Sequence, residues 1–375
     1  MKFAFLTNQP SYYQIHFAQA MASRLGEDNF RIVFAKGLSA DRHEMGWQDE
    51  YHQPYIIRLS DSPSQKKECE HWIESADVVI QGRFPVKHVR KRIESGKLTF
   101  ACQERLWKKP VSRYRKLSRL PHLYKNYFSL NKPNYHFLAV GAYAAQDMLD
   151  LGVFRDRCWQ YGYFIDCPSY QPKAVKDHLE LLWCGRFCEF KQPLKAIELL
   201  AAFKKFGLNI RLTMIGDGEL KPQAELLAAT LGVLELVRFP GWQTQPQITE
   251  YMKNADLFAM TSHQGEGWGL VINEAMSLGC AVIANQDLGS STVLVEHGKS
   301  GFLYQGNDVT NIAKEVSGHS IEQLLDIGKN AHTSMMQNWS AEQAATATIA
   351  LSEQLLSGQM GQARRNGSSG ICSPI

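Results

Sequence analysis

With 375 residues, the chain is about twice the common size of one domain, so two domains are expected. Its hydrophobic content of 44% and charged content of 21% are ordinary for a globular protein, and they exclude a wholly disordered chain. The sequence has no apolar run of about eighteen residues, which excludes a transmembrane helix.

The net charge of +4 conceals an uneven distribution. Residues 1–167 hold 25 Lys+Arg against 17 Asp+Glu, whereas the remainder holds 16 against 20. The segment 105–146 contains nine basic residues and no acidic one. We therefore expect negatively charged partners on the N-terminal half of the chain.

The N-terminus and the cysteines indicate a cytoplasmic protein. The apolar run that follows Lys2 is too short for a secretion signal, and it predicts a first β-strand instead. The eight cysteines show no paired spacing typical of metal ligands. Free thiols of a reducing compartment are expected rather than a disulfide framework.

Short apolar runs alternate with helical patterns in the first half, which is typical of a parallel α/β architecture. Strands are predicted at 2–7, 30–35, 55–59, 77–81, 98–102 and 136–140. Helices are predicted at 13–25, 66–75, 86–95 and 142–151. The pattern stops where two prolines interrupt the segment 162–178. We predict a Rossmann-like domain over 1–165 and a linker over 166–178.

The same alternation resumes after the linker and predicts a second Rossmann-like domain over 179–338. Its strands are expected at 180–185, 210–216, 236–241, 256–262, 281–285 and 301–304. Its helices are expected at 193–206, 220–231, 245–254, 269–278, 308–317 and 321–337. A C-terminal helix is predicted over 339–357, with Ser340 as its N-cap, before a flexible Gly/Ser/Arg-rich tail over 358–375. Two such domains form a cleft, with ligands at the carboxyl ends of the strands.

Two loops after predicted strands carry groups suited to a phosphorylated ligand. In CGRFCEFKQP, Arg186 supplies a forked donor and Lys191 a point charge, a combination that suits a diphosphate. In MIGDGEL, the glycines allow the backbone to approach a ligand, and Asp217 could cap the next helix. A solvated loop would explain the first segment without a ligand, and a plain turn between strand and helix would explain the second.

The segment GEGWGLVINEAMSLG places two acids eight positions apart, at Glu266 and Glu274. Gly265–Gly269 is predicted to form a loop that enters a helix, whose free N–H groups favour a phosphate or a sugar oxygen. A carboxylate accepts two hydroxyl hydrogen bonds, as vicinal diols require. We expect Glu274 to lie one and a half turns inside the helix on a partly buried face, where an unpaired carboxylate is costly. Without a ligand, Glu266 would be an acid that interacts with the helix dipole and Glu274 an exposed helix residue.

A fourth segment, DLGSSTVLVEHGKSGFLY, could supply backbone and hydroxyl donors to phosphate oxygens from Gly289 to Thr292. A serine-rich turn without a ligand would explain the same residues.

The order of "GRF…K", "IGDG", "EGWGLVINEAMSLG" and "VEHGKSGFLY" resembles the retaining nucleotide-sugar glycosyltransferases of family four, the group 1 glycosyl transferases. The resemblance covers residues 180–337, and its most specific part is the pair of glutamates. It looks like the bacterial members that build capsule, lipopolysaccharide or related surface glycans. It implies the GT-B fold: two Rossmann-like domains that face a cleft, with the C-terminal helix crossing back to the N-terminal domain.

The resemblance also implies residue roles. Arg186 and Lys191 would hold the donor diphosphate, Glu274 the ribose hydroxyls and Glu266 the hydroxyls of the transferred sugar. Further donor contacts would come from Gly185, Asp217, Gly218, Gly267, Trp268, Gly269, Ser290 and Ser291. The chain departs from the family's G-G-x-x-E pattern, because Ser290 replaces the second glycine and Val293 the glutamate.

The implied reaction is a front-side displacement that retains the anomeric configuration, with a UDP- or GDP-linked sugar as donor. The sequence has no Asp-x-Asp pair, so no metal cofactor is expected. A glycoside hydrolase, which also uses two acids, fits the neighbouring cations less well. An epimerase and a phosphorylase are further enzyme classes that the fold would allow. An inactive homologue that serves as a binding or scaffold subunit would be a protein without enzyme activity.

For the acceptor, a glycan or a lipid-linked sugar, we expect contacts in the N-terminal half. Glu104, Arg105 and His16 are candidates near strand ends, although a helical histidine is often structural. The basic stretch, residues 104–128, interleaves aromatic residues with Lys and Arg. It is predicted to contact anionic lipid headgroups or a lipid diphosphate on the inner membrane face. Its candidates are Lys108, Lys109, Arg113, Arg115 and Lys116. The stretch matches no nucleic-acid-binding motif, and a solvated helix would explain it without a partner.

Overall fold

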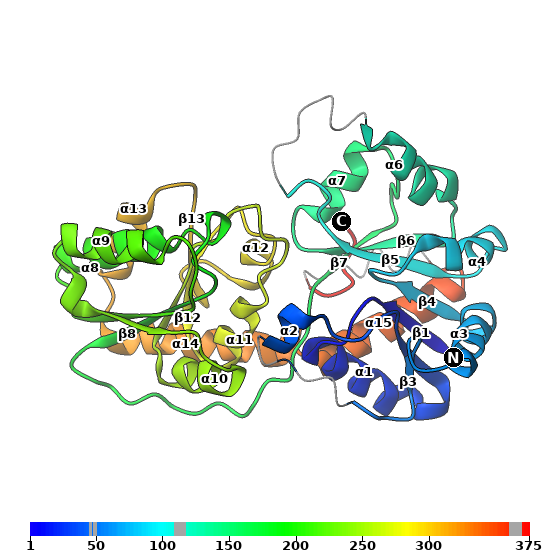
Figure 1. Ribbon diagram of the computed structural model, residues 1–375, viewed down its shortest axis with the longest axis horizontal. Helices are drawn as coiled ribbons and strands as arrows, with labels where there is room; N and C mark the ends of the chain where they lie inside the picture. Colours follow the sequence, from blue (N-terminus) through cyan, green and yellow to red (C-terminus); the bar gives the residue numbers. More distant parts are fainter. Residues whose placement is uncertain (45–46, 48–50, 109–117, 360–369) are drawn as a thin grey trace. The chain divides into compact units, whose positions relative to one another are not determined.

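The computed structural model describes residues 1–44, 47, 51–108, 118–359 and 370–375 (Figure 1). The chain divides into two compact units. Unit 1 contains Met1–Asp166 and Asn338–Ile375, and unit 2 contains Cys167–Gln337. Each unit is built on a parallel β-sheet with helices on its faces, as the alternating pattern predicts.

Unit 1 contains a seven-stranded sheet in the order β3-β2-β1-β4-β5-β6-β7, with every pair of neighbours parallel. Its strands are β1 (Phe3–Thr7), β2 (Phe30–Phe34), β3 (Ile56–Arg58), β4 (Val78–Gln81), β5 (Thr99–Glu104), β6 (Tyr135–Val140) and β7 (Cys158–Tyr161). Its helices are α1 (Tyr12–Leu25), α2 (Ala40–Glu44), α3 (Pro63–Ser75), α4 (Arg90–Glu94), α6 (Leu120–Asn126), α7 (Ala144–Asp150) and α15 (Ala341–Leu356). Short 3-10 turns lie at Glu27–Asn29, Val86–His88 and Phe128–Leu130.

The last helix, α15, belongs to unit 1 although it follows unit 2 in the sequence. It packs beside α1, and Arg24 on α1 forms an ion pair of 3.0 Å with Glu342 at the start of α15. The Tyr161 hydroxyl lies 3.2 Å from Thr348 Oγ1 on the same helix. The expected return of the C-terminal helix to the N-terminal domain is therefore observed.

Unit 2 contains a six-stranded parallel sheet in the order β10-β9-β8-β11-β12-β13. Its strands are β8 (Leu179–Cys184), β9 (Ile210–Ile215), β10 (Val237–Gly241), β11 (Leu257–Met260), β12 (Ala281–Asn285) and β13 (Gly301–Tyr304). Its helices are α8 (Pro193–Lys205), α9 (Lys221–Thr230), α10 (Gln245–Asn254), α11 (Val271–Ser277), α12 (Ser291–Leu294), α13 (Val309–Val316) and α14 (Ile321–Ser334). Two 3-10 turns, η4 (Glu189–Lys191) and η5 (Leu234–Leu236), and a π-helical turn (Met335–Trp339) complete the described elements from residue 167 to the start of α15.

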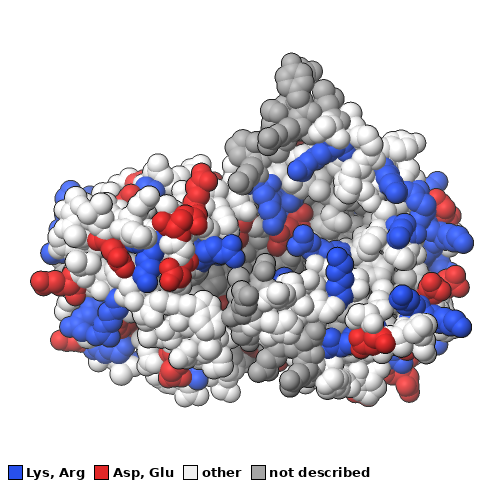
Figure 2. Space-filling model, in the orientation of Figure 1, with Lys and Arg blue, Asp and Glu red and all other residues white. Residues whose placement is uncertain are grey.

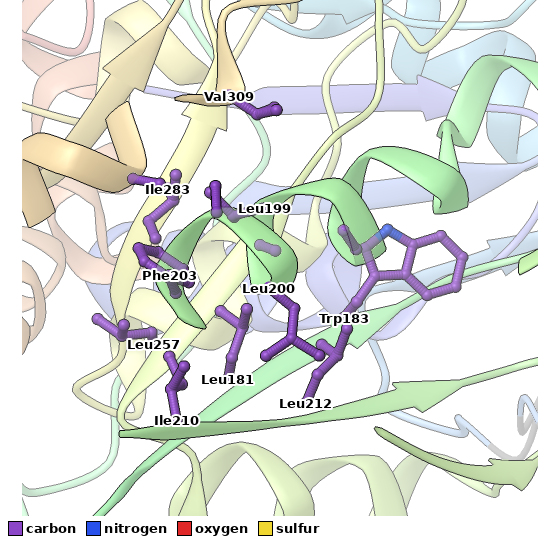
Figure 3. Packing of buried hydrophobic residues seen from close by; sticks show 14 of the residues in the cluster. Leu181, Trp183, Leu199, Leu200, Phe203, Ile210, Leu212, Leu257, Ile283 and Val309 are labelled. Atoms are coloured by element: carbon purple, nitrogen blue, oxygen red, sulfur yellow. The ribbon is translucent and has the colours of Figure 1, made fainter. Parts of the chain in front are cut away.

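A hydrophobic core lies between α8 and the strands of unit 2 (Figure 3). Helix α8 contributes Leu199, Leu200 and Phe203, all essentially inaccessible to solvent. The strands contribute Leu181, Trp183, Ile210, Leu212, Leu257 and Ile283, and Val309 of α13 packs at the margin. This apolar packing fixes the strand ends, from which the loops of the candidate site emerge.

Several element boundaries differ from the prediction. Strand β7 was not predicted, and the helix expected over 86–95 is a 3-10 turn followed by the short α4. The helix expected over 269–278 begins at Val271, because Gly269 adopts the left-handed conformation (φ 85°), which cannot start a right-handed helix.

The expected linker, residues 166–178, has no helix or strand but is packed against unit 2. The Lys173 ammonium donates to the carbonyl of Ala255, and the carbonyl of Pro168 lies 2.7 Å from Nε2 of His332. These contacts explain why the boundary between the units follows Asp166 rather than the end of the predicted linker.

The last six residues of the tail that the sequence predicts to be flexible form backbone hydrogen bonds with β7. Gly370–Ile375 runs along the edge of β7, where the Cys372 N–H donates to the Gln160 carbonyl at 2.7 Å. The Gln160 N–H in turn donates to the carbonyl of Ser373 at 2.8 Å. An unpaired strand edge presents free backbone donors and acceptors, and the tail satisfies those of β7. Residues 360–369 lie outside the described part of the chain.

Within the described residues, no helix is long and apolar enough to cross a bilayer. Basic side chains gather on the visible face of unit 1, over the part that carries α4 and α6 (Figure 2). This position agrees with the basic excess in residues 1–167.

Candidate functional site

The loop between β8 and α8 carries both predicted phosphate-binding cations. Arg186 is exposed, and no described residue forms a hydrogen bond or ion pair with its guanidinium. Lys191 lies at the end of η4, and Gln192 follows in the left-handed conformation (φ 48°, ψ 56°) before Pro193 begins α8. The chain thus turns sharply after Lys191, so that the lysine lies at the end of the β8–α8 loop, directly before the helix.

Lys191 forms an ion pair with Glu266, one of the two acids that the sequence singles out. Its Nζ lies 2.6 Å from Glu266 Oε1, and the two side chains are only 16% and 17% exposed. The other carboxylate oxygen, Oε2, is shielded from solvent and has no hydrogen-bond partner among the described residues. The ammonium carries three N–H donors, so this contact leaves two for other acceptors.

Hydrogen bonds between the loops hold this ion pair in place. The Thr261 hydroxyl, directly after β11, donates to the Lys191 carbonyl at 2.7 Å and accepts from Trp183 Nε1–H at 2.9 Å. The His263 N–H donates to the Phe190 carbonyl at 3.1 Å. Because β8 and β11 are neighbours in the sheet, their following loops lie side by side at its carboxyl edge.

The two glycines of IGDG allow the loop after β9 to pack on the loop after β8. A Cβ at Gly216 would lie 2.0 Å from the Gly185 carbonyl oxygen, and one at Gly218 would lie 2.6 Å from the Phe187 carbonyl oxygen. Asp217 does not cap the following helix as expected, because α9 has Leu220 as its N-cap. The Asp217 carboxylate instead accepts from the Gly218 N–H at 2.8 Å.

Glu274 lies in the first turn of α11, not one and a half turns inside it, because the helix starts later than predicted. Its side chain is half-buried, and Oε1 accepts from Gln245 Nε2 of α10 at 2.8 Å. One partner of this carboxylate is therefore a neutral amide. The Trp268 side chain points into the interior and donates to Asn273 Oδ1 at 2.8 Å, and Gly267 and Gly269 on either side of it are buried as well.

The pKa of the Cys184 thiol, at the end of β8, is affected by burial and by the charges of Glu274 and Lys191. Burial raises its pKa to about 12, with a further increase from Glu274 and an opposing effect of Lys191. The thiol stays protonated at neutral pH and does not act as a nucleophile there.

Ser290 and Ser291 lie at the start of α12, after β12, and are fully buried. Neither hydroxyl has a hydrogen-bond partner among the described residues. Buried hydroxyls are nearly always satisfied in folded proteins, so two adjacent unsatisfied ones are unusual. They remain candidates for donor contact, as the sequence predicts.

The described acids, cysteines and histidines contain no group of three or more that could hold a metal ion. Among the described residues, the loops at the carboxyl edge of this sheet bring together the Arg186 guanidinium, the Lys191 ammonium and the Glu266 and Glu274 carboxylates. Cations of this kind bind and stabilise phosphate oxygens, and carboxylates bind hydroxyl groups.

In unit 1, Glu104 ends β5 and is held by two donors. The Tyr163 hydroxyl donates to Oε1 at 2.8 Å, and Lys108 forms an ion pair with Oε2. Burial and the negative charge of Glu104 raise the pKa of Tyr163 well above its usual value, so the phenol remains a donor. The ring of Tyr13 packs against that of Tyr163 with centroids 4.6 Å apart.

The other acceptor candidates have structural contacts. Arg105 lies over the ring of Tyr143 and 3.9 Å from Asp147, whose carboxylate also accepts backbone N–H groups of the same loop. His16 Nδ1 accepts from the Asp166 N–H at 3.1 Å, and burial lowers the pKa of His16 despite the nearby Asp166 carboxylate. The predicted candidates Lys109, Arg113, Arg115 and Lys116 lie outside the described residues.

Thr261, His263 and Gln245 contact the site but were missed by the sequence analysis. Thr261 and His263 stand beside the recognised loop Gly265–Gly269, so their position after a buried strand was an available signal. Gln245 begins another helix, and nothing in the local sequence indicates its contact with Glu274.

Comparison with known proteins identifies the segment that carries this site. Residues 170–332 match the family Glycosyl transferases group 1. The match contains Arg186, Lys191, Glu266 and Glu274, and it agrees with the resemblance predicted for residues 180–337. The family description rests on this part of the chain, which forms nearly all of unit 2.

Curated relatives match less than half of the chain. The D-inositol 3-phosphate glycosyltransferase 2 of Catenulispora acidiphila is 31% identical over 186 residues, which is 46% of this chain and 43% of that protein. The putative colanic acid biosynthesis glycosyltransferase WcaL of Escherichia coli is 27% identical over 178 residues, 44% of each chain. The chain thus spans less than half the length of these relatives.

Solved structures share the fold of almost the whole chain. HepE of Anabaena in complex with UDP covers 95% of this chain and 100% of its own, with a TM-score of 0.64 and 18% sequence identity. The lipopolysaccharide outer core galactosyltransferase WaaB covers 94% and 100%, with a TM-score of 0.63 and 18% identity. These likenesses confirm the predicted α/β architecture of two Rossmann-like domains, the GT-B fold.

Proposed function

We propose that the chain is a retaining glycosyltransferase that moves a hexose from a UDP- or GDP-linked donor to a glycan or lipid-linked acceptor in cell-surface polysaccharide biosynthesis. The observation that carries the proposal is the convergence of Arg186 and of the Lys191–Glu266 pair at one sheet edge. The family match of this segment and the names of the relatives, among them a colanic acid biosynthesis enzyme, support it.

The charges of the site suit a nucleotide diphosphate. Arg186 offers a fork of donors that no described residue engages, and Lys191 keeps donors beyond the one given to Glu266. Glu274 binds the ribose hydroxyls, which replace the neutral Gln245 as its hydrogen-bond partner. The unsatisfied Glu266 Oε2 accepts a hydroxyl of the transferred sugar.

In this proposal, transfer proceeds by front-side displacement. The acceptor oxygen attacks the anomeric carbon from the face that the diphosphate leaves, and the acceptor proton passes to a departing phosphate oxygen. Arg186 and Lys191 stabilise the negative charge that develops on the leaving diphosphate. Fixed cations in a partly dehydrated site are worth several kcal/mol, in the range of about 3–4 kcal/mol for each essential donor. The chemistry requires no metal ion.

For the acceptor side, we propose a peripheral contact of unit 1 with anionic membrane lipids. Helix α6 exposes Leu120 (45%) and Tyr124 (64%) beside the cations Arg119 and Lys125, a combination that suits a lipid interface. The charge-reversed variant R119E/K125E is expected to lose co-sedimentation with anionic vesicles, whereas K204E/K205E on α8 of unit 2 is expected to keep it. Equal binding of both variants would contradict the contact.

The alternative is an inactive homologue that binds a nucleotide sugar as a scaffold subunit, which the replacement of the family glutamate by Val293 favours. Measuring UDP and GDP release from a panel of nucleotide sugars separates the two. The proposed enzyme releases nucleotide from at least one donor. Binding without release in the presence of candidate acceptors would support the scaffold, and neither binding nor release would refute both.

A further inference from the structure

Immediately before Glu266, the chain forms a turn that is held by a hydrogen bond from the Gly265 backbone to the His263 side chain. Nδ1 of His263 accepts the Gly265 N–H at 2.9 Å, and the His263 carbonyl accepts the Glu266 N–H at 3.0 Å. A ring nitrogen that accepts from the residue two positions later reproduces the turn that Asn and Asp side chains form. Nδ1 of histidine and Oδ1 of asparagine are separated from Cα by the same number of bonds.

The turn connects the two loops that hold the ion pair. The His263 N–H donates to the carbonyl of Phe190, the residue before Lys191. Gly265 packs closely against His263 and Phe190: a Cβ at this position would lie 2.9 Å from His263 Cε1 and 2.9 Å from Phe190 Cβ. The turn therefore requires glycine at position 265. Because glycine loses more conformational freedom on ordering than any other residue, the hydrogen bond to the imidazole is needed to restrain the Gly265 backbone.

We propose that His263 is a positioning residue for Glu266. Its ring fixes the turn 263–266, and the turn places the Glu266 carboxylate 2.6 Å from Lys191 Nζ. The inference rests on the proposed function, in which Glu266 acts on the transferred sugar. Loss of the ring bond is expected to leave Glu274 in place, because the bond of Glu274 with Gln245 does not involve His263. The expected consequence is slower turnover with nearly unchanged nucleotide affinity.

The test compares His263→Ala with His263→Asn, because asparagine restores an acceptor at the position of Nδ1. His297→Ala is the matched control, because Nδ1 of His297 also accepts a backbone N–H, that of Leu303 at 3.0 Å. Leu303 belongs to the edge strand β13, and neither residue lies in the loops that carry Arg186, Lys191 and Glu266. Donor turnover is measured as nucleotide release, and affinity by calorimetric titration with UDP and GDP.

H263A is expected to lower turnover about tenfold, the effect of losing one hydrogen bond of ordinary strength, with nucleotide affinity within about twofold of wild type. H263N is expected to recover most of this turnover, and H297A to retain it. The positioning role is overturned if H263A and H263N are equally active or equally impaired. It is also overturned if nucleotide affinity falls as much as turnover.

Amide hydrogen exchange of residues 261–269 tests the turn without relying on enzyme activity. Exchange is expected to be faster in H263A than in wild type and H263N. If wild type turns over no donor, the proposed function fails, and the exchange rates still decide whether His263 holds the turn. Equal exchange in all three proteins would refute the positioning role even in an active enzyme.

Discussion

Lys191 Nζ and Glu266 Oε1 lie 2.6 Å apart, although 75 positions separate them in the sequence. The pair joins the loops after two adjacent strands, β8 and β11. Both side chains are largely buried, so each depends on the other for compensation of its charge. Removing either partner would leave an unpaired charge at the candidate donor site.

Because these residues act as one unit, we predict non-additive losses. Lys191→Met and Glu266→Gln are each expected to reduce donor turnover by about 10²–10³-fold, the effect of removing one fixed transition-state contact. The double variant is expected to be no slower than the slower single variant. Steady-state nucleotide release from the four proteins measures the coupling.

A matched control uses the pair Lys195–Glu198 on α8, which has the same 2.6 Å separation but lies outside the proposed contacts. Lys195→Met is expected to change turnover by less than about threefold, as for an ordinary partly exposed ion pair. Full activity of K191M, or losses that multiply in the double variant, would refute the coupling.

The proposed role of Glu274 predicts discrimination between nucleotides. Wild type is expected to bind its nucleotide, UDP or GDP, about tenfold or more tightly than the 2′-deoxy form of that nucleotide, because a hydroxyl bond to a carboxylate is worth about 1.5–3 kcal/mol. Glu274→Ala is expected to bind the two alike. Calorimetric titration measures both affinities, with Glu225→Ala on the exposed face of α9 as the control. Retained discrimination in E274A would assign the ribose contact elsewhere.

Buried His136 predicts loss of stability in mild acid. Burial, and secondarily the charge of Arg157, lowers its pKa from 6.5 to about 3, and Nδ1 accepts from Trp159 Nε1–H at 3.2 Å. Between these two pH values only the unfolded chain binds the proton, so stability rises with pH across this window and is lost as pH falls. The slope is at most about 1.4 kcal/mol per pH unit.

Urea unfolding at pH 7.0, 5.5 and 4.5 measures this dependence. His136→Phe is expected to flatten it, whereas the exposed His71→Ala is expected to leave it unchanged. An H136F variant as acid-sensitive as wild type would show that other groups control the loss.

The backbone hydrogen bonds to β7 predict a stabilising role for residues 370–375. Its backbone bonds to Cys158 and Gln160 span 2.7–3.1 Å, and each is worth about 0.5–1.5 kcal/mol. Deleting Gly370–Ile375 is expected to lower the melting temperature by several degrees and to increase light scattering, because the exposed edge of β7 can pair with another chain. Cys372→Ser, which keeps the backbone, serves as the control. Unchanged melting and scattering after deletion would contradict this role.

The sequence predicts the sheets well because parallel strands are buried on both faces and read as continuous apolar runs. The completely buried AVIAN of β12 is such a run. Strand β7 was missed because it is only four residues long and contains Gln160. The length of α11 was overestimated because the positive φ of Gly269 cannot be read from the local sequence. A side chain at this position would also collide with Leu288 and Met260, which are distant in the sequence.

The site could be predicted in part because the carboxyl ends of parallel strands meet at one edge. This rule brings Arg186, Lys191 and Glu266 to the same region from sequence alone. It cannot give the Lys191–Glu266 distance, nor the contact of Gln245 with Glu274, because both depend on the relative depth of separate loops. The acceptor candidates Arg105 and His16 were chosen for charge and position, and the structure shows their contacts with Asp147 and Asp166.

The central claim, a nucleotide diphosphate site at the carboxyl edge of the second sheet, is tested most directly by titrating UDP and GDP into wild type, Arg186→Ala, Lys191→Ala and Glu274→Ala. The account predicts that wild type binds at least one of the two nucleotides. It also predicts that each substitution weakens binding about tenfold or more, as expected for charge-assisted hydrogen bonds. Absence of binding to wild type, or equal affinity of all four proteins, would contradict it.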